Sequence, residues 1–599
     1  MGELRAIIPY FRPYMRSLYW GVVFVFFANL FQMAGPYLIK LGLEAMDASD
    51  PDVAGAQIAM YAGLIVVTAL FGGAARYGMR ELLNGMSRRI ECDLRDDFFR
   101  HLLRLDATFY SATRTGDLMS RATNDTLAVR MAVGPAVMYT ANTIVGFIFS
   151  LALMLWISPR LTLYGMVPMI VLPTVVSGFG RIIHRRFEAI QEQFSSLSTF
   201  VQENLTGVRI VRAYTQEAEQ ARQFDTYNQE YRHKNMSLVL SAGAFHPVLM
   251  LISGLAVVLV TWLGALEVIA GRMTVGDFVA FGLYLTMLIW PMIALGWVVN
   301  LYQRGAASMG RLNKILDAKP AVEVPLQPAS LAHALGRIEF RNVSFAYPDT
   351  ERDVLDAIDF VVEPGATVAI VGPTGSGKST LVGLLARLYD PTAGEILLDG
   401  VNLTDVDPAD LRLRIGMVPQ DSFLFSTTIA DNIGLGLNSG EPRVGDSGEP
   451  SDVIAAAAAV AQLSEQIEDF PNGYRTMLGE RGINLSGGQK QRATLARALA
   501  RDPLILILDD ALSAVDTHTE AKILGDLRSV MKQRTSFIIS HRVSAVMHAD
   551  EILVLEEGAL VERGTHAELI NGSGTYARLL RRQVLEEDLD SPLATTSGD

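Results

Sequence analysis

Residues 372–380 read Gly-Pro-Thr-Gly-Ser-Gly-Lys-Ser-Thr and directly follow the short apolar run 367–371. The apolar run predicts a buried strand, and the sequence after the glycines is able to begin a helix. Glycines at this spacing let backbone N–H groups close around phosphate oxygens, and the N-terminus of the following helix favours an anion. The order of strand, glycine turn and helix therefore predicts a loop that binds the phosphates of a nucleotide.

The side chains of this loop have separate roles in binding ATP and Mg²⁺. Lys378 is able to reach the β- and γ-phosphates, and the hydroxyl of Ser379 is able to ligate Mg²⁺. By residue frequency, such a pattern arises by chance in about one protein of this length in fifty, and the preceding strand makes chance rarer still. The candidate phosphate-binding residues are Gly372, Thr374, Gly375, Ser376, Gly377, Lys378, Ser379 and Thr380.

A second apolar run, 504–508, ends in the acidic pair Asp509-Asp510. Such a run is typical of a buried parallel strand, and a carboxylate at its end is placed to hold Mg²⁺. Taken alone, the pair would be better explained as solvent-facing residues at the end of a strand. Beside a phosphate-binding loop, Asp509 becomes a candidate magnesium ligand together with Ser379.

The composition of the 599-residue chain indicates two domains of different character. Hydrophobic residues make up 50% of the chain and charged residues 19%, and the mean hydropathy is +0.26. Six stretches without charged residues are long enough to cross a bilayer, which takes about 20 residues. A buried helix of a large soluble protein would explain one of them but not six. The predicted spans are 17–39, 53–75, 131–159, 161–180, 236–266 and 278–303.

The loops between the predicted spans set their orientation. Residues 76–130 and 181–234 are rich in arginine, whereas the first short loop carries Asp47, Asp50 and Asp52. Because basic loops stay on the cytoplasmic side, both long loops should be cytoplasmic. Their Leu, Phe and Arg residues at helical spacing predict that helices two to five continue well into the cytosol.

Charge and cysteine content exclude other classes of protein. The formal net charge of −13 and the lack of a basic stripe with interleaved aromatics argue against nucleic-acid binding. The single cysteine, Cys92, cannot form an intrachain disulfide, which is consistent with a cytosol-facing polar half. The N-terminus lacks a short apolar core before a small-residue cleavage site, so we predict no cleaved signal peptide.

The predicted fold is an α-helical six-helix transmembrane domain with long cytoplasmic extensions, fused to an α/β P-loop ATPase domain. The expected boundaries are a transmembrane domain at 1–317, a linker at 318–336, the ATP-binding domain at 337–584 and a disordered acidic tail at 585–599.

Two further features of the sequence are the segment 434–450 and His246. Residues 434–450, rich in Gly, Ser and Pro, predict an exposed loop. His246 lies within a predicted span, where an ionisable group is costly to bury. For His246, a neutral histidine bonded to a neighbouring carbonyl is favoured over a functional role.

Further motifs make the chain resemble the ABC transporter family over nearly its whole length. A Gly-Gly pair alone would indicate only a loop, and a lone histidine only a polar core residue, so the set carries the resemblance. The motifs are Leu485-Ser-Gly-Gly-Gln489, similar to the family signature; Val418-Pro-Gln-Asp421, with Gln420 in the Q-loop; Ser540-His541-Arg542, the switch motif; and Tyr347, at the adenine-stacking position.

The apolar half resembles the six-helix exporter type of this family. Residues 115–121 and 207–215 occupy the positions at which coupling helices of the family touch the cassettes. Residues 479–482 resemble the exporter-specific loop that contacts these helices. The resemblance implies a multi-pass protein of the cell membrane with a cytoplasmic cassette. Closure of the cassettes would turn the transmembrane cavity outward, so ATP binding would shift the population of the membrane domain.

In this family two cassettes close head to tail around ATP, so the resemblance implies that one chain alone forms no complete site. Within the chain, Gln420 would sense and ligate Mg²⁺, and His541 would sense the γ-phosphate. The signature would contact the ATP held by a partner chain, with Ser486 and Gly488 at its γ-phosphate. The expected signature contacts are Ser486, Gly487, Gly488 and Gln489.

The chain departs from the family pattern at Asp510. Catalytic members carry glutamate there to polarise the attacking water, and aspartate is one methylene shorter. The following stretch 511–516, which resembles the D-loop, has Val515 where leucine is usual. Both changes resemble the weakly hydrolysing half of heterodimeric exporters. We therefore expect Asp510 to be a weak catalytic residue and favour a heterodimer over a slow homodimer.

The expected function is ATP-driven export of small amphipathic molecules, such as drugs, lipids or peptides. A soluble ABC ATPase shares the cassette but has no membrane spans, so the first half of the chain argues against that class. An ATP-gated channel or regulator has the same domains and would show conductance without substrate-stimulated hydrolysis. An importer on the same fold is a further alternative, because the nucleotide motifs do not encode the direction of transport.

Overall fold

A computed structural model of the chain describes residues 2–47, 50–348, 350, 352–437, 441, 443–444 and 449–590. The chain folds into two compact units, and the second unit includes one short segment from the first part of the sequence. The first unit comprises Met1–Leu103 and Thr115–Ala318, and the second comprises Arg104–Arg114 and Lys319–Asp599. The acidic tail 585–599 is predicted to be disordered, but residues 585–590 form the end of a helix, and 591–599 lie outside the described residues. Of the loop predicted at 434–450, residues 438–440, 442 and 445–448 lie outside the described residues.

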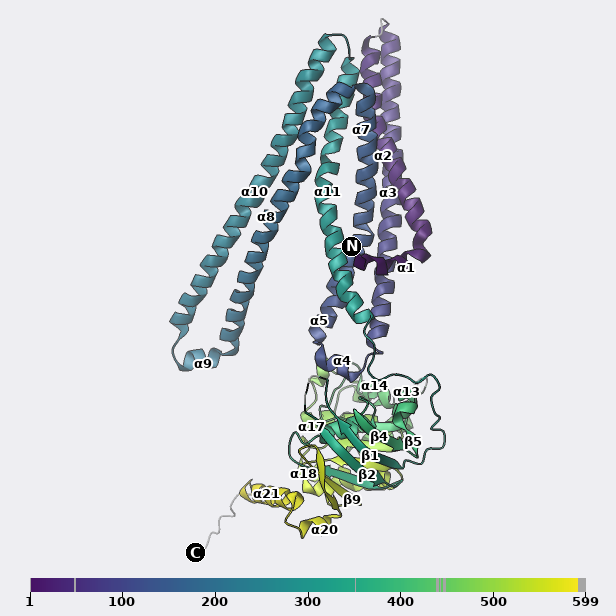
Figure 1. The fold of residues 1–599 in the computed structure, drawn as a ribbon, viewed down its shortest axis with the longest axis vertical. Helices are drawn as coiled ribbons and strands as arrows, with labels where there is room; N and C mark the ends of the chain where they lie inside the picture. Colours follow the sequence, from purple (N-terminus) through teal and green to yellow (C-terminus); the bar gives the residue numbers. More distant parts are fainter. Residues whose placement is uncertain are drawn as a thin grey trace. The chain divides into compact units, whose positions relative to one another are not determined.

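The first unit consists of helices only (Figure 1). Its six long stretches have 42 to 53 residues each, and among the described residues they are the helices long and apolar enough to cross a membrane. At about 1.5 Å per residue, they exceed the roughly 30 Å of a bilayer core, so they continue beyond it as predicted. The main helices of these stretches are α2 (Met15–Glu44), α3 (Pro51–Leu102), α7 (Pro135–Ile157), α8 (Pro159–Thr206), α10 (Glu217–Ile269) and α11 (Val275–Leu316). Shorter helices complete the first stretch, Gly2–Glu44, and the third, Thr115–Ile157.

Shorter helices connect these spans. Pro residues begin α3, α7 and α8, where a missing N–H costs nothing. The short elements are η1 (Gly2–Ile7), α1 (Ile8–Phe11), η2 (Arg12–Tyr14), η3 (Ala45–Asp47), α5 (Thr115–Ser120), the π-helical turn η4 (Arg121–Asp125), α6 (Thr126–Val133) and α9 (Val208–Ala213).

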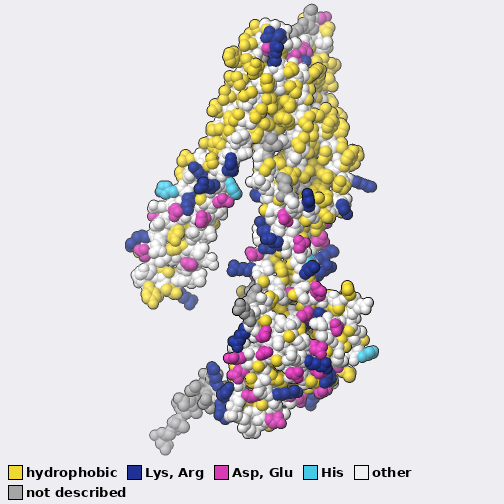
Figure 2. Space-filling view, in the orientation of Figure 1, with side chains coloured by type: hydrophobic (Ala, Val, Ile, Leu, Met, Phe, Trp, Pro, Cys, Tyr) yellow, Lys and Arg dark blue, Asp and Glu magenta, His cyan; other side chains and the backbone are white. Residues whose placement is uncertain are grey.

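Buried polar groups between the spans are hydrogen-bonded to one another. The hydroxyl of Tyr284 on α11 donates to the carbonyl of Met33 on α2 (2.9 Å), and Asn29 donates to the side chain of Asn142 on α7 (3.0 Å). Figure 2 shows hydrophobic side chains over much of the outer surface of these helices. An apolar exterior with a satisfied polar interior is what a bilayer requires.

The predicted role of His246 is not confirmed. Its side chain is exposed on α10, and within the described chain it makes no hydrogen bond to a neighbouring carbonyl. Because the side chain is exposed, burial does not require it to have a hydrogen-bond partner.

The second unit is an α/β fold with two sheets. The antiparallel sheet has the order β2-β1-β4-β5, and the larger sheet has the order β10-β9-β3-β8-β7-β6, parallel except for β9–β10. The strands are β1 (Ile338–Phe345), β2 (Leu355–Val362), β3 (Thr367–Val371), β4 (Ala393–Leu398), β5 (Val401–Asn402), β6 (Ile415–Val418), β7 (Ile505–Asp509), β8 (Thr535–Ile539), β9 (Glu551–Glu556) and β10 (Ala559–Gly564).

Helices surround these sheets. Every residue of β7 and β8 is buried, as expected for parallel strands covered on both faces. The helices are α12 (Lys378–Leu385), η5 (Leu403–Asp405), α13 (Pro408–Leu413), α14 (Ile429–Ile433), η6 (Gly434–Gly436), α15 (Asp452–Val460), α16 (Ser464–Glu468), η7 (Gly473–Arg475), η8 (Glu480–Gly482), α17 (Gly487–Ala500), α18 (Thr517–Met531), α19 (Val543–Val546), α20 (His566–Ile570) and α21 (Thr575–Asp590).

The segment Arg104–Arg114 belongs to the second unit although it lies between helices of the first. It contains the short helix α4 (Ala107–Ala112) and the buried side chain of Leu105. The resemblance places the first coupling segment at 115–121, and this placement stays a prediction. Those residues form α5 and the start of η4, which cluster with the transmembrane helices.

The stacked rings of Phe340 on β1 and Phe360 on β2 provide a test of the second unit's core. Their centroids lie 4.5 Å apart, and Phe340 is 0% exposed. We expect Phe340→Ala to destabilise this unit by about 3–5 kcal/mol, because it leaves a cavity between the strands. Calorimetry of the purified protein should show a lower unfolding temperature for the ATPase domain. Phe423→Ala, at a position that is 47% exposed, is the control and should change it little.

Candidate functional site

Three neighbouring strands bring the predicted site residues to one edge of the sheet. Ile370 of β3 pairs with Ile539 of β8, and Ile539 pairs with Asp509 of β7. The glycine loop follows β3, the acidic pair ends β7, and His541 follows β8. Because adjacent strands lie about 4.8 Å apart, these groups are held within reach of one nucleotide phosphate chain.

The loop between β3 and α12 has a backbone that only glycine adopts without strain. Gly375 and Gly377 have φ values of +83° and +96°. A Cβ atom on Gly377 would lie 2.7 Å from the side chain of Leu355 and 2.8 Å from the carbonyl of Val354. The glycines are therefore required by the turn itself, as well as by the close approach of a ligand.

Lys378 is the first residue of α12 and is only 6% exposed. Its ammonium group donates to the carbonyls of Gly372 (2.9 Å) and Pro373 (2.7 Å). Burial lowers the pKa of Lys378, and the nearby carboxylates of Asp509 and Asp510 only partly offset this. A phosphate at the loop would supply the anionic partner that favours the charged lysine.

Asp509 offers an oxygen ligand without a partner. Its side chain is 4% exposed, and its Oδ1 atom has no hydrogen bond in the described part of the chain. Burial raises the pKa of Asp509, while a hydrogen bond with Ser379 lowers it. Ser379 and Gln420 line the same cavity. Oxygen donors of this kind, completed by phosphate oxygens and water, suit Mg²⁺.

Among the described residues, no group of three or more His, Cys, Asp or Glu side chains is arranged to hold a metal ion. The oxygen atoms of Asp509, Ser379 and Gln420 at one cavity fit a Mg²⁺ ion whose remaining ligands would come from a nucleotide and water.

Asp510 has a left-handed backbone, with φ +49°. Its N–H donates to the carbonyl of Ile539 (2.9 Å), and its carbonyl accepts from the hydroxyl of Ser513 (3.0 Å). Aspartate tolerates this backbone region better than most residues. These two bonds hold the backbone of Asp510 in place. The distance that its carboxylate reaches from the backbone therefore depends on the length of the side chain.

The structure brings most of the predicted residues of the chain's own ATP site to one cavity of about 210 Å³. Tyr347 lies beside it, with its hydroxyl 3.1 Å from that of Thr380. The buried hydroxyl of Ser376 has no hydrogen-bond partner within the described residues. The cavity is lined by Val354, Thr374, Gly375, Gly377, Lys378, Ser379, Thr380, Gln420, Asp509, Asp510, Ile539 and His541.

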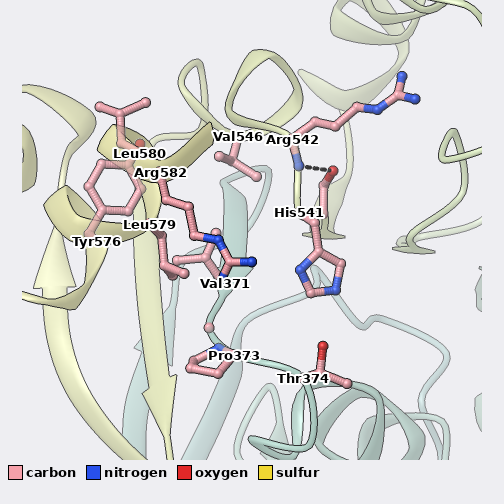
Figure 3. A pocket seen from close by; sticks show the side chains of 12 residues that line it. Val371, Pro373, Thr374, His541, Arg542, Val546, Tyr576, Leu579, Leu580 and Arg582 are labelled. Atoms are coloured by element: carbon pink, nitrogen blue, oxygen red, sulfur yellow. Dashed lines mark hydrogen bonds between the residues drawn. The ribbon is translucent and has the colours of Figure 1, made fainter. Parts of the chain in front are cut away.

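A second cavity, of about 380 Å³, lies on another side of His541 (Figure 3). Val371, Pro373 and Thr374 line one side, and Tyr576 and Leu580 of α21 line the other. The switch histidine thus lies between the phosphate loop and an additional space next to the C-terminal helix.

The predicted signature residues do not join this site. Ser486 caps α17: its hydroxyl accepts from the N–H of Gln489 (3.3 Å), and the Gln489 side chain accepts from the N–H of Ser486 (2.9 Å). None of the residues 486–489 lines the cavity at the phosphate loop. A helix N-terminus is suited to an anion.

Two residues that the sequence reasoning missed fix the loop after Asp510. Gln491 on α17 donates to the hydroxyl of Ser513 (2.8 Å) and accepts from the N–H of Ala514 (2.8 Å). Arg542 donates to the carbonyls of Ser513 (3.0 Å) and Val515 (3.2 Å). The sequence contained one indication of the role of Gln491: a polar residue on an otherwise apolar helix face needs a hydrogen-bond partner when it is buried.

The six-helix transmembrane unit and the α/β unit with its phosphate loop define a membrane protein driven by nucleotide. The sequence matches the family "ABC transporter transmembrane region" over residues 18–292 and the family "ABC transporter" over residues 355–513. The chain belongs to the ABC transporter family.

Its relatives match over nearly their full lengths. The chain is 38% identical to a probable multidrug resistance ABC transporter ATP-binding/permease protein, YheI, of Bacillus subtilis, covering 97% of this chain and 98% of that one. It is 36% identical to the multidrug resistance-like ATP-binding protein MdlA of Escherichia coli, covering 97% and 96%. A solved bacterial Atm1-family ABC exporter with ATP bound is 29% identical and covers 96% and 99%, with a TM-score of 0.79.

These findings confirm the predicted fold class and the predicted class of activity. The chain is an exporter-type ABC protein, an ATP hydrolase coupled to transport that acts as a dimer, and its six spans place it in the plasma membrane with a cytoplasmic ATPase domain.

Lys378 allows the first test of the site. We expect Lys378→Ala to weaken ATP binding at this loop by about tenfold or more, because a nearly buried phosphate loses its cationic partner. The measurement is photolabelling of the purified protein by an ATP analogue, with the labelled peptide identified. Lys532→Ala, at an exposed lysine of the same unit, is the control. Unchanged labelling of Lys378→Ala would show that the loop is not the ATP site.

Proposed function

We propose that this chain is one half of a heterodimeric ABC exporter and that its own ATP site holds nucleotide but hydrolyses it weakly. The observation that carries the proposal is the aspartate at position 510, at the end of β7, in place of the longer glutamate. Its backbone N–H is bonded to β8 at 2.9 Å, so the main chain has little freedom to move the carboxylate outward. The missing methylene removes about 1.5 Å of reach, which costs on the order of a hundredfold in rate.

The other groups of the site remain suited to binding. Lys378 and the loop N–H groups would hold the phosphates, and His541 would lie near the γ-phosphate. Ser379, Asp509 and Gln420 would hold Mg²⁺, which when bound neutralises charge on the β- and γ-phosphates. Tyr347, next to the P-loop helix, would stack on the adenine. One site would thus be able to bind and retain ATP while hydrolysing it only weakly.

The signature end of the cassette is intact and would serve the partner. Ser486 is the residue before the 14-residue helix α17. The side chains of Ser486 and Gln489 cap the start of this helix. Such an end is able to bind the γ-phosphate of a nucleotide held by another chain. Separation of residues 486–489 from the chain's own phosphate cavity supports a site shared between two chains.

The transmembrane unit suits small amphipathic cargo. It combines partly exposed aromatic pairs, such as Tyr139–Trp297 with ring centroids 4.9 Å apart, with a few hydrogen-bonded polar groups. Apolar and aromatic surfaces of this kind bind drugs, lipids or hydrophobic peptides without a dedicated charge. The multidrug names of two relatives agree with this class of substrate.

The composition of the native complex tests the heterodimer. Mass measurement of the complex purified in detergent from its own cells should show this 65.4-kDa chain with one different ABC chain. Two copies of this chain and no other ABC subunit would contradict the proposal.

Substitutions at Asp510 test the weak site. Asp510→Ala should leave most of the steady-state ATPase activity of the complex, because the partner's site does most of the hydrolysis. When the partner's catalytic carboxylate is removed, Asp510→Glu should raise the residual rate, by up to about a hundredfold.

Asp502→Glu is the matched control for Asp510→Glu. Asp502 has φ +50° but an exposed side chain at the other end of β7, so the same change should leave the ATPase rate unaltered. Loss of all turnover in Asp510→Ala would mean that the site is catalytic as it stands.

A further inference from the structure

The signature stretch is held by a side chain from a different helix. Gln489 of α17 accepts from the N–H of Ser486 (2.9 Å) and donates to the side-chain oxygen of Gln466 on α16 (3.1 Å). Arg492, further along α17, donates to the same oxygen (2.6 Å). A single amide oxygen of Gln466 therefore accepts from two residues near the start of the signature helix.

Arg492 connects this oxygen to the backbone of the signature. Its side chain is 6% exposed and donates to the carbonyls of Gly488 (3.3 Å) and Gln462 (2.6 Å). Burial lowers the pKa of Arg492, and the charge of Asp516 raises it. A guanidinium that has lost its water depends on protein acceptors, so the position of Arg492 follows from where these oxygens lie.

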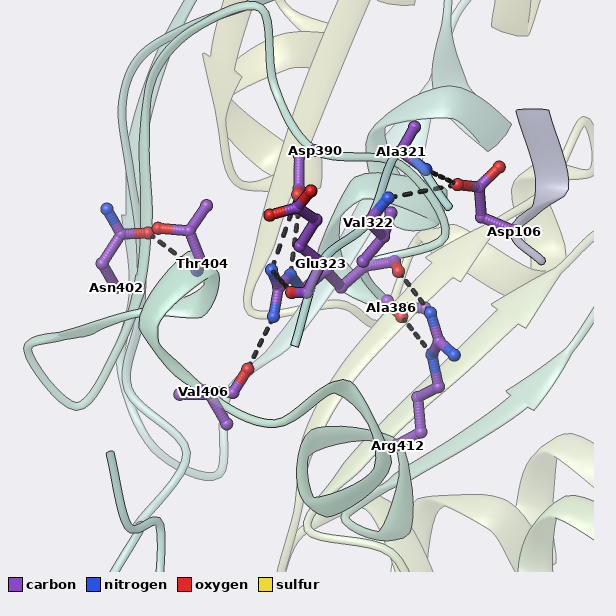
Figure 4. Close-up of polar contacts among 11 residues, drawn as sticks. Asp106, Ala321, Val322, Glu323, Ala386, Asp390, Asn402, Thr404, Val406 and Arg412 are labelled. Carbon is purple, nitrogen blue, oxygen red and sulfur yellow. Dashed lines mark hydrogen bonds and ion pairs between the residues drawn. The ribbon is translucent and has the colours of Figure 1, made fainter. Parts of the chain in front are cut away.

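A second buried arginine of the same unit shows what is particular to Arg492. Arg387 is 3% exposed and donates to the carbonyl of Glu323 (3.0 Å) (Figure 4). Arg387 also pairs with the carboxylate of Asp390 at 2.9 Å. For Arg492, the corresponding side-chain acceptor is the neutral amide of Gln466. The position of Arg492 thus depends on an uncharged side chain that at the same time holds the signature.

Gln466 lies on an anchored helix. The next residue, Ile467, is fully buried, and so is Leu463, which precedes α16. Both belong to the same hydrophobic core as Leu485, the residue before Ser486. Packed neighbours on both sides therefore fix the position of the amide oxygen relative to the signature.

We propose that Gln466 is a positioning residue for the γ-phosphate of the nucleotide held by the partner chain. Its oxygen holds Gln489, which accepts from the N–H of Ser486. The same oxygen holds Arg492, which donates to the carbonyl of Gly488. The signature thereby keeps the shape in which Ser486 and Gly488 meet the phosphate. The proposal rests on the proposed site shared between two chains, but not on whether the partner is a different chain or a second copy.

The test is Gln466→Leu in the purified full complex. Leucine is close to glutamine in size but accepts no hydrogen bond, so Gln489 and Arg492 lose their shared acceptor. The steady-state ATPase rate at saturating ATP should fall about tenfold, as expected when a hydrogen bond to a charged group is lost. Photolabelling of 372–380 by an ATP analogue should stay as in the unmodified protein, because none of these side chains lines the cavity at that loop.

Gln466→Glu separates the acceptor from the other properties of the side chain. Within the described residues the amide nitrogen of Gln466 makes no hydrogen bond, so a carboxylate of the same size retains both contacts. This variant should keep the ATPase rate of the unmodified protein. Glu468→Leu, at an exposed position of the same helix, is the matched control for Gln466→Leu and should also leave the rate unchanged.

Ser486→Arg distinguishes failure of the positioning role from failure of the shared site. A large side chain there would block the approach of the partner's nucleotide, so hydrolysis should be abolished. If it is abolished and Gln466→Leu does not reduce the rate, the positioning role is wrong and the shared site stands. If Ser486→Arg leaves the rate unchanged, the shared site is wrong and the positioning role falls with it.

Two further outcomes would overturn the positioning role alone. A rate as low in Gln466→Glu as in Gln466→Leu would show that the acceptor oxygen is not what matters. Loss of photolabelling at 372–380 in Gln466→Leu would show a merely structural role, because the chain's own phosphate loop would then be disturbed as well.

Discussion

The parallel ladder of β3, β8 and β7 sets the positions of all groups that act on the phosphates. Ile370, Ile539 and Asp509 are paired across it, and the loop, the switch histidine and the acidic pair each begin within two residues of these positions. The ladder spacing is fixed by backbone hydrogen bonds, which side chains do not alter. A site built in this way tolerates little adjustment, so one methylene at position 510 has a large expected effect.

The same rigidity would apply to both nucleotide sites to which, in the proposed function, one cassette contributes. The phosphate loop lies at the end of β3, whereas the signature lies at the start of α17, and Gln491 connects that helix to the loop after Asp510. Arg542, next to the switch histidine, holds the same loop from the other side. The loop after Asp510 is therefore connected by hydrogen bonds both to α17 and to the residue after the switch histidine.

The transmembrane unit follows a different constraint. In a bilayer each backbone N–H and C=O needs a partner within the chain, so the apolar stretches have to be helices. Buried polar side chains find partners within the unit: Tyr284 donates to the backbone carbonyl of Met33, and Asn29 donates to the side chain of Asn142. The phosphate loop, in contrast, lies in the polar α/β unit.

The sequence alone determined the six spans, the phosphate loop and the strand before Asp509, because each depends on neighbours within about twenty residues. A charge-free run is a helix in lipid, and a glycine turn after an apolar strand is a phosphate loop, wherever they occur. Only the tertiary structure decided that 104–114 joins the cassette, that His246 lacks the expected bond and that Gln491 reaches Ser513. The links Asp106–Val322 and Arg387–Glu323 join residues 216 and 64 positions apart. Backbone carbonyls and N–H groups are present in every residue, so such contacts leave no pattern in the sequence and arise only when the packed core brings the segments together.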